Sequence, residues 1–252
     1  MPQTFEVLYY QGLESLLQCT DEKQIYVAKF SDYIIRYNAN SLLDIGAGDG
    51  QVALPLSEMV EDYVAIEQNP QYAARLRQAG KQVIEEVFPT EVKGLYDLVL
   101  MSHVISHTAG EHATLVPPAW GLVKPGGHLL VVTHLGIKQD DWSQLLDHVG
   151  LGYSEQFNDS LHDCLRALQA KGETEIQNVT STLTADTVTQ MIMAMAFLAS
   201  NGERARNDAF MERADEVVTI LGDRYHTADR LSFPFLHLFV STQKPATAVD
   251  SY

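Results

Sequence analysis

The sequence predicts an α/β fold in which a mostly parallel sheet of seven strands carries helices on both faces. Short apolar runs that read as buried strands alternate with segments of helical period between residues 41 and 134. The first run, SLLDI, passes directly into the glycine-rich turn GAGDG. The last run, FPFLHLFVSTQ, reads as a strand and follows a long helical stretch. These patterns predict a parallel core with additional helices before its first strand and before its last.

Residues 1–40 precede this alternation and read as two helices. The segments FEVLYYQGLESLLQ and EKQIYVAKFSDYIIRY carry apolar or aromatic residues at i, i+3 and i+4. The core alternation follows, with a strand at each of YDLVLM and HLLVVTH. Later in the chain ETEIQNVTSTL reads as a strand, and VTQMIMAMAFLAS and DAFMERADEVVTILGDRY read as helices. Pro117 and Pro118 are expected to start a helix.

The turn at residues 46–50 is typical of a strand–turn–helix unit whose backbone approaches a ligand closely, because glycine has no Cβ atom. Dinucleotide-binding turns follow G-x-G-x-x-G, whereas this turn has Gln51 at the last position and its third glycine, Gly50, one residue earlier. A carboxylate at Asp44 can hold an ammonium group, but it would repel a pyrophosphate. The turn therefore favours a zwitterionic, cationic cofactor.

The segment DIGAGDG, residues 44–50, resembles motif I of the class I S-adenosylmethionine-dependent methyltransferases, (D/E)-h-G-x-G-x-G, at every position. The resemblance implies a Rossmann-like sheet, S-adenosyl-L-methionine as the cofactor and S-adenosyl-L-homocysteine as its product. The residues of this motif that it implies for cofactor binding are Asp44, Gly46, Ala47, Gly48 and Gly50.

Further segments match the family in order along the chain. DYVAIE ends at Glu67, which by resemblance bridges the ribose hydroxyls, and Gln68 is the next cofactor residue that the resemblance implies. Nicotinamide enzymes also place an acid at this position, so Glu67 alone does not distinguish the two cofactor classes. KQVIEE ends in two acids, of which Glu86 is expected near the adenine amino group. GLVKPGGHLLVVTH resembles the turn into the fifth strand. YDLVLMSHVISH resembles the fourth-strand motif and places three more residues beside the cofactor: Met101, Ser102 and His103.

Methyl transfer from a sulfonium is an in-line displacement, so orientation and desolvation can supply much of the acceleration. A hydroxyl acceptor also needs a general base, whereas an amine only has to arrive neutral. By resemblance to members with a similar fourth-strand run, His107 lies near the methyl end of the cofactor and is the candidate base. A role for His107 in shaping the loop is the alternative. His103 is expected to pack beside the cofactor.

The resemblance also predicts how the chain is organised. We expect a helical lid at residues 1–40, a cofactor-binding core at 41–183, a helical insertion that caps the substrate at 184–232, the last core strand at 233–243 and a flexible tail at 244–252. The lid and the cap would close the methyl end of the cofactor from two sides, which suits a small-molecule substrate. The candidates for substrate contact are Tyr9, Tyr10 and Tyr26.

Composition narrows the class of partner. Acidic residues outnumber Lys and Arg by 33 to 17, for a formal net charge of −16, and no dense basic cluster is present, which argues against nucleic acid. No apolar run reaches the ~18 residues of a membrane helix, and no signal segment follows Met1, so we expect a soluble, cytoplasmic protein without a membrane partner. Cys19 and Cys164 read as reduced thiols. The oligomeric state is left open.

No metal is expected. The series His103, His107, His112 has no accompanying Cys or Asp, and the acids of the magnesium-dependent catechol-type methyltransferases have no counterpart at Met101. The sequence therefore predicts a metal-free methyltransferase that acts on the oxygen or nitrogen of a small molecule. Two alternatives stay open, an NAD(P)-dependent oxidoreductase and a non-catalytic cofactor-binding protein of the same fold.

Overall fold

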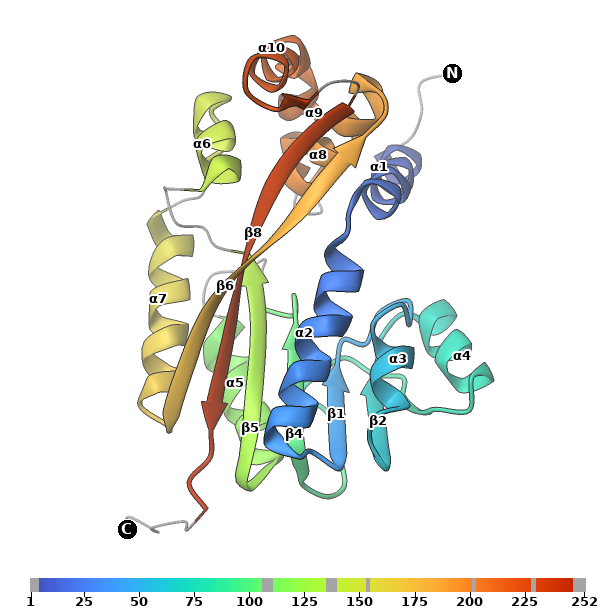
Figure 1. Ribbon diagram of the computed structural model, residues 1–252, viewed down its shortest axis with the longest axis vertical. Coiled ribbons are helices and arrows are strands. Elements are labelled where there is room, and N and C mark those ends of the chain that lie inside the picture. Colours follow the sequence, from blue (N-terminus) through green and yellow to red (C-terminus); the bar gives the residue numbers. More distant parts are fainter. Residues whose placement is uncertain are drawn as a thin grey trace. The chain divides into compact units, whose positions relative to one another are not determined.

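The computed structural model describes residues 5–105, 111–134, 140–152, 155–200, 203–227 and 230–246 (Figure 1). The chain forms two compact units. We call the first the sheet unit; it comprises Lys23–His134, Gln156–Val179 and His237–Tyr252. We call the second the helical unit; it comprises Met1–Glu22, Leu135–Glu155 and Thr180–Leu236.

The sheet has the strand order β3-β2-β1-β4-β5-β8-β6. β1 to β5 pair in parallel, and β8 pairs antiparallel with β5. The predicted fold class, a Rossmann-like and mostly parallel seven-stranded sheet, is therefore confirmed. The strands are β1 (Ser41–Ile45), β2 (Asp62–Ile66), β3 (Gln82–Ile84), β4 (Tyr96–Ser102), β5 (Val123–His134), β6 (Glu173–Ala185) and β8 (Arg230–Gln243). A further strand of two residues, β7 (His226–Thr227), pairs with β8 in the helical unit.

The register of the central strands brings their carboxyl ends together. Ile45, the last residue of β1, lies opposite Ile66 of β2 and Met101 of β4. The strand order reverses between β1 and β4, and in open α/β sheets ligands bind in the crevice outside the strand ends at such a switch point. The expected ligand site therefore lies where β1, β2 and β4 end.

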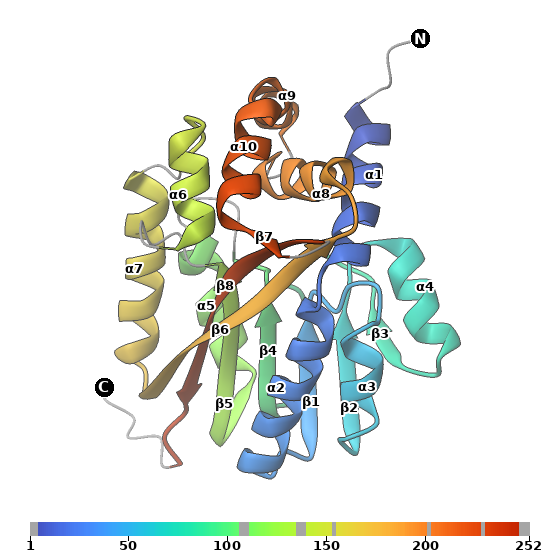
Figure 2. The ribbon, with the colours of Figure 1, turned by 45° about the horizontal axis from the view of Figure 1, so that its top comes forward.

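Helices cover the sheet unit on both faces. Figures 1 and 2 show α2 in front of the parallel strands and α5 behind them. Apolar residues of α2, α3 and α4, among them Phe30, Leu56 and Leu76, belong to one buried cluster with strand residues such as Leu42 and Leu130. The helices are α2 (Glu22–Tyr37), α3 (Ala53–Ser57), α4 (Pro70–Gln78), α5 (Glu111–Gly121) and α7 (Glu155–Gln169).

One helix start differs from the expectation. α5 begins at Glu111, so Pro117 and Pro118 lie inside the helix rather than at its start. Proline lacks the N–H group that an interior helical position donates, and this is why the pair suggested a start. By contrast, Pro70 does stand at the first turn of α4, where the Asn69 side chain accepts hydrogen bonds from the N–H groups of Gln71 and Tyr72.

The helical unit has a core of its own, built around Trp142, Met195, Phe210 and Phe233. Its N-terminal segment is joined to β6, since the N–H of Thr182 donates to Asp21 Oδ1 at 2.7 Å. Its helices are α1 (Phe5–Cys19), α6 (Asp141–His148), α8 (Val188–Ser200), α9 (Arg204–Glu212) and α10 (Ala214–Arg224). The single helix expected over residues 208–225 is thus two helices, α9 and α10. Among the described helices of both units, none is long and apolar enough to cross a membrane.

Candidate functional site

The glycine-rich turn lies at the carboxyl end of β1, and two of its glycines are required for different reasons. Gly46 has a φ of +77°, and a Cβ atom there would lie 2.8 Å from Cγ2 of Val104. Gly48 has a φ of +65°, and a Cβ atom there would meet nothing closer than the Gly46 carbonyl oxygen at 4.0 Å. Gly46 therefore permits close packing of the chain, whereas the space beside Gly48 is open to a ligand. The N–H of Gly46 donates to the Ile66 carbonyl at 2.8 Å and anchors the turn to β2.

Glu67 follows β2 and is held by two backbone groups. One carboxylate oxygen accepts the Gly48 N–H at 2.7 Å, and the other accepts the Asn69 N–H at 2.7 Å. The residue is buried, with 6% of its surface exposed. A carboxylate oxygen accepts more than one hydrogen bond, so both oxygens keep acceptor capacity for a pair of hydroxyl groups. Gln51, which replaces the third glycine of the dinucleotide turn, bonds through its side-chain amide to Asp49 at 2.6 Å.

Asp44 is buried in β1 and has one hydrogen-bond donor from the next strand. The Tyr63 hydroxyl donates to Asp44 Oδ2 at 2.9 Å. The pKa of Asp44 is raised to about 6: burial is the main cause, the Tyr63 hydrogen bond opposes it, and the nearby charge of Glu67 adds a smaller rise. The structure thus keeps an acid with a near-neutral pKa directly behind the turn, where a cationic group would favour its ionised form.

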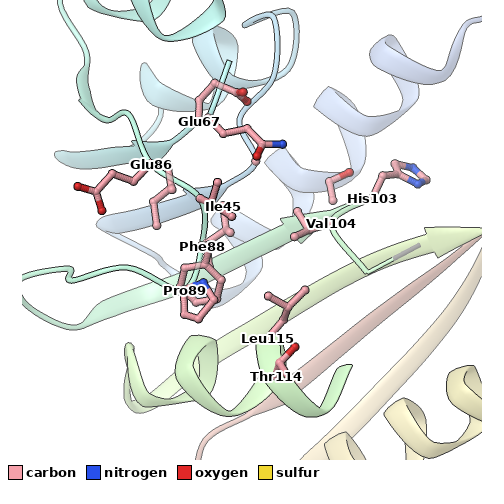
Figure 3. Close-up of a pocket in the computed structure, with 14 residues that line it drawn as sticks. Ile45, Glu67, Glu86, Phe88, Pro89, His103, Val104, Thr114 and Leu115 are labelled. Atoms are coloured by element: carbon pink, nitrogen blue, oxygen red, sulfur yellow. The ribbon is translucent and has the colours of Figure 1, made fainter. Parts of the chain in front are cut away.

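A pocket of about 600 Å³ opens at the ends of β1, β2 and β4. Figure 3 shows Glu67 at one end of it and Phe88, Pro89, Leu115 and Thr114 at the other. The remaining lining residues are Ile45, Gly46, Ile66, Gln68, Glu86, Val87, Ser102, His103 and Val104. One end is therefore polar and acidic, and the other is largely apolar.

The structure brings only some of the expected cofactor residues to the pocket. Those that line it are Gly46, Glu67, Gln68, Glu86, Ser102 and His103. Asp44, Ala47, Gly48 and Gly50 belong to the adjoining strand and turn and are not among its lining residues, and Met101 is fully buried. Glu86 is exposed, accepts a hydrogen bond from the Thr90 hydroxyl, and in Figure 3 its carboxylate turns away from Phe88 and Leu115.

Sequence reasoning missed the apolar end of the pocket. Phe88 and Pro89 follow the expected acid pair after one intervening residue, Val87, and Thr114 and Leu115 come from α5. The aromatic residue two positions after Glu86 was the available signal for Phe88. No signal of comparable strength marked Thr114 or Leu115, because the helix was expected to start only at Pro117.

His103 follows β4 directly and is in an uncommon backbone conformation. Its φ is +56°, a region that residues other than glycine rarely occupy and that clusters at functional sites. Its Nε2 lies 2.5 Å from the Tyr26 hydroxyl, which in turn lies 2.7 Å from Nδ1 of His237. Tyr26 and His237 are buried, with 1% and 0% of their surfaces exposed. Tyr26 therefore contacts a lining residue and does not itself line the pocket.

Three further expected residues have no described side chain. The backbone of Tyr9 and Tyr10 lies in α1, but their side chains are outside the described part of the structure, and so is all of His107.

Comparison with known proteins identifies similar sequences and folds. A family model described as "Methyltransferase domain" matches residues 22–171. Among curated proteins no sequence relative matches. The YcgJ protein from Bacillus subtilis is similar in structure, with a TM-score of 0.53 and 15% identity over 87% of this chain and 98% of that one. A methyltransferase candidate from Bacillus halodurans has a TM-score of 0.54 and 15% identity over 81% of this chain and 92% of that one.

The plantazolicin methyltransferase BpumL, solved with a monoazolic desmethylPZN analog and SAH, has a TM-score of 0.51 and 11% identity over 89% of this chain and 84% of that one. At these identities the three structures support only the fold of this chain, and the family model supports the relationship of the chain to that family.

Proposed function

The chain belongs to the methyltransferase-domain family, whose model covers more than half of it, and we propose that it transfers the methyl group of S-adenosyl-L-methionine to an oxygen or nitrogen atom of a small molecule. The observation that carries this proposal is the hydrogen bond between Glu67 and the N–H of Gly48, at the polar end of the pocket.

The residues at the polar end fit the sugar and amino-acid parts of this cofactor. Glu67 offers two fixed acceptor oxygens, which a ribose with two neighbouring hydroxyls can satisfy. The open space beside Gly48 allows a chain to pass close to the backbone. Asp44 supplies negative charge behind the turn for the ammonium group, directly or through water. When bound, the cofactor supplies an activated methyl group on a sulfonium.

The apolar end fits a planar base. Phe88, Pro89 and Leu115 line it, and aromatic and apolar side chains of this kind bury the faces of a purine. We propose that Glu86 binds the exocyclic amino group of the base, and for this contact the exposed Glu86 side chain has to turn inward. Gln68, Ser102 and His103 also line the pocket.

The proposed reaction needs a positioned acceptor and the exclusion of water, and it needs no metal ion. We propose that His107, Tyr9 and Tyr10 face the acceptor, and that the segments 1–40 and 184–232 select it. Closure of the pocket by these segments would favour a small molecule over nucleic acid, in keeping with the net charge of −16. We propose the cytoplasm as the site of action.

Two measurements test this function. Mass spectrometry of the purified, denatured protein should find S-adenosyl-L-homocysteine or the methyl donor, together with any small molecule that co-purifies. Incubation with methyl-labelled S-adenosyl-L-methionine and a panel of small phenols and amines should yield a labelled product. Binding of the donor with no labelled product from any acceptor would favour the non-catalytic alternative. Binding of NADH without binding of S-adenosyl-L-methionine would favour the oxidoreductase.

A further inference from the structure

Tyr63 and Asp44 form a hydrogen bond between two neighbouring strands of the sheet unit. Tyr63 lies in β2 opposite Leu42 of β1, and Asp44 follows Leu42 after one residue, so the Leu42 and Asp44 side chains point to the same face. The Tyr63 hydroxyl donates to Asp44 Oδ2 at 2.9 Å, and only 8% of the tyrosine and 4% of the aspartate are exposed. The phenol therefore reaches along the sheet toward the strand ends at which the pocket opens.

The Asp44 carboxylate has fewer hydrogen-bond donors than the other buried acid of the site. Glu67 accepts two backbone N–H groups, one on each oxygen. Among the described residues, Asp44 accepts a hydrogen bond only from Tyr63. On its other side β4 places the apolar Leu100 opposite Asp44. Because ionisation of a buried carboxyl is costly without a donor, the Tyr63 hydroxyl is the group that favours the charged form of Asp44.

Tyr63 and Glu67 are the titratable groups that act on the Asp44 carboxyl. Burial raises the pKa of Asp44 to about 6, against the lowering effect of the Tyr63 hydrogen bond, and the charge of Glu67 adds a smaller rise. Burial and the charge of Asp44 raise the pKa of Tyr63 well above its usual value, so the phenol keeps its proton and remains a donor. Loss of this hydroxyl would therefore raise the pKa of Asp44 further, toward neutral pH.

We propose that Tyr63 is a positioning residue that stabilises the ionised carboxylate of Asp44 and thereby sets the pH below which the site loses affinity for S-adenosyl-L-methionine. This proposal rests on the proposed function, in which Asp44 supplies negative charge for the ammonium group of the methyl donor, and adds to it a control of the same site by pH. When Asp44 takes up a proton, the charge behind the turn is lost and the attraction for the ammonium group falls. Tyr63 keeps this change below neutral pH, so the site retains its affinity at pH 7.

Carbon-13 spectra of the full-length protein, labelled at the aspartate carboxyl, test the pair without any ligand, and Asp44→Asn assigns the signal. The Asp44 carboxyl should titrate near pH 6 in the wild type and about one pH unit higher in Tyr63→Phe, which keeps the ring and loses the hydroxyl. Tyr96→Phe is the matched control, because Tyr96 is a buried tyrosine at the start of β4 whose hydroxyl donates to the Lys93 carbonyl oxygen. It should leave the Asp44 titration unchanged. Equal titrations in the wild type and the Tyr63→Phe variant would overturn the proposal.

Titration calorimetry with S-adenosyl-L-methionine between about pH 5 and pH 8 gives the second test. The wild-type affinity should fall below about pH 6, and the Tyr63→Phe affinity should be roughly five-fold below it at pH 6 and nearly equal to it at pH 8. Tyr96→Phe should match the wild type throughout, and Asp44→Asn should bind weakly at every pH.

Two binding results would overturn the proposal. One is a wild-type affinity that does not change with pH, a result that does not depend on the folding of any variant. The other is an equal loss of affinity at every pH in Tyr63→Phe, which would make the tyrosine merely structural. Absence of binding to the wild type at every pH would instead reject the proposed function, and the carboxyl titration would still decide whether Tyr63 sets the ionisation of Asp44.

Discussion

The carboxylate of Glu67 accepts a hydrogen bond from the backbone N–H of Gly48, with 2.7 Å between oxygen and nitrogen. This contact ties the end of β2 to the turn that follows β1. It fixes the direction of a buried carboxylate toward the pocket before any ligand arrives, and such preorganisation reduces the ordering cost of binding.

Gly48→Val should abolish binding of S-adenosyl-L-methionine, because the new side chain fills the open space beside the turn and also strains a backbone with φ of +65°. Gly80→Val is the matched control. Gly80 also has a positive φ, +78°, and a Cβ atom added there would meet nothing within 4 Å, but it does not line the pocket. Titration calorimetry and circular dichroism should show a folded Gly48→Val variant without affinity and a Gly80→Val variant with normal affinity. Similar affinity losses in both variants would point to strain alone.

Cofactor binding near pH 6 should release protons. Burial raises the pKa of Asp44 from 3.8 to about 6 in the free protein, so the carboxyl is partly protonated there. A bound ammonium group favours the ionised form and lowers this pKa again, so the proton leaves. Calorimetry at pH 6 in two buffers of different ionisation enthalpy should give different apparent enthalpies, and at pH 8 the same enthalpy. Asp44→Asn should remove the difference at pH 6, and its persistence in this variant would assign the proton to another group.

The stability of the protein should fall as the pH drops from 7 to 5, in part because of His128. This buried residue stacks on Tyr37 with centroids 3.5 Å apart, and burial lowers its pKa from 6.5 to about 4. Between these two pH values the unfolded chain binds the proton and the folded protein does not. The contribution of neutral His128 to the free energy of unfolding is therefore complete above pH 6.5 and is lost as the pH falls toward 4. His128→Phe should reduce the loss in the free energy of unfolding between pH 7 and 5 by about 2 kcal/mol.

Urea unfolding at the two pH values measures this effect. His162→Gln serves as the control, because His162 is exposed on α7. It should leave the pH dependence as in the wild type, and a His128→Phe variant with the wild-type pH dependence would show that His128 is not responsible.

Alanine substitutions at two glycines in helices of the helical unit should change the stability of the protein in opposite directions. A Cβ atom on Gly12 of α1 would lie 2.8 Å from Cβ of Phe197 and 3.0 Å from the Met193 carbonyl oxygen in α8. Gly12→Ala should therefore destabilise the protein by about 1–3 kcal/mol. Gly222 of α10 has nothing within 4 Å of such an atom, so Gly222→Ala should stabilise by up to about 1 kcal/mol. Thermal melts of both variants provide the comparison, and a neutral Gly12→Ala would refute the close approach of α1 and α8.

Much of the fold could be predicted because its signals are local. The turn after β1, the helix α2 and the helix α8 each follow from a short stretch of sequence, and the observed bounds of both helices agree with the periodicity. The start of α5 could not be predicted in this way, since Pro117 and Pro118 are locally unfavourable in a helix interior and tertiary packing overrides that preference.

The site could be predicted only in its local parts. The motif around Gly48 and the acid Glu67 are readable from spacing. The apolar end depends on which face of α5 meets the strand ends, and the contact between Tyr26 and His237 joins residues 211 positions apart, so no local pattern encodes it. The structure thus changes the interpretation of Tyr26 from a candidate for substrate contact to a buried partner of two histidines.

The central claim is that the turn after β1 and Glu67 bind S-adenosyl-L-methionine. Titration calorimetry of the full chain with S-adenosyl-L-methionine, S-adenosyl-L-homocysteine and NADH tests it most directly, with Glu67→Gln as the informative variant and Glu85→Gln, an exposed acid paired with Arg77, as its control. We expect both sulfur compounds to bind and NADH not to bind, with affinity lowered about 10-fold or more in Glu67→Gln and unchanged in Glu85→Gln. Binding of NADH alone, or equal affinity in the Glu67→Gln variant and the wild type, would contradict the account.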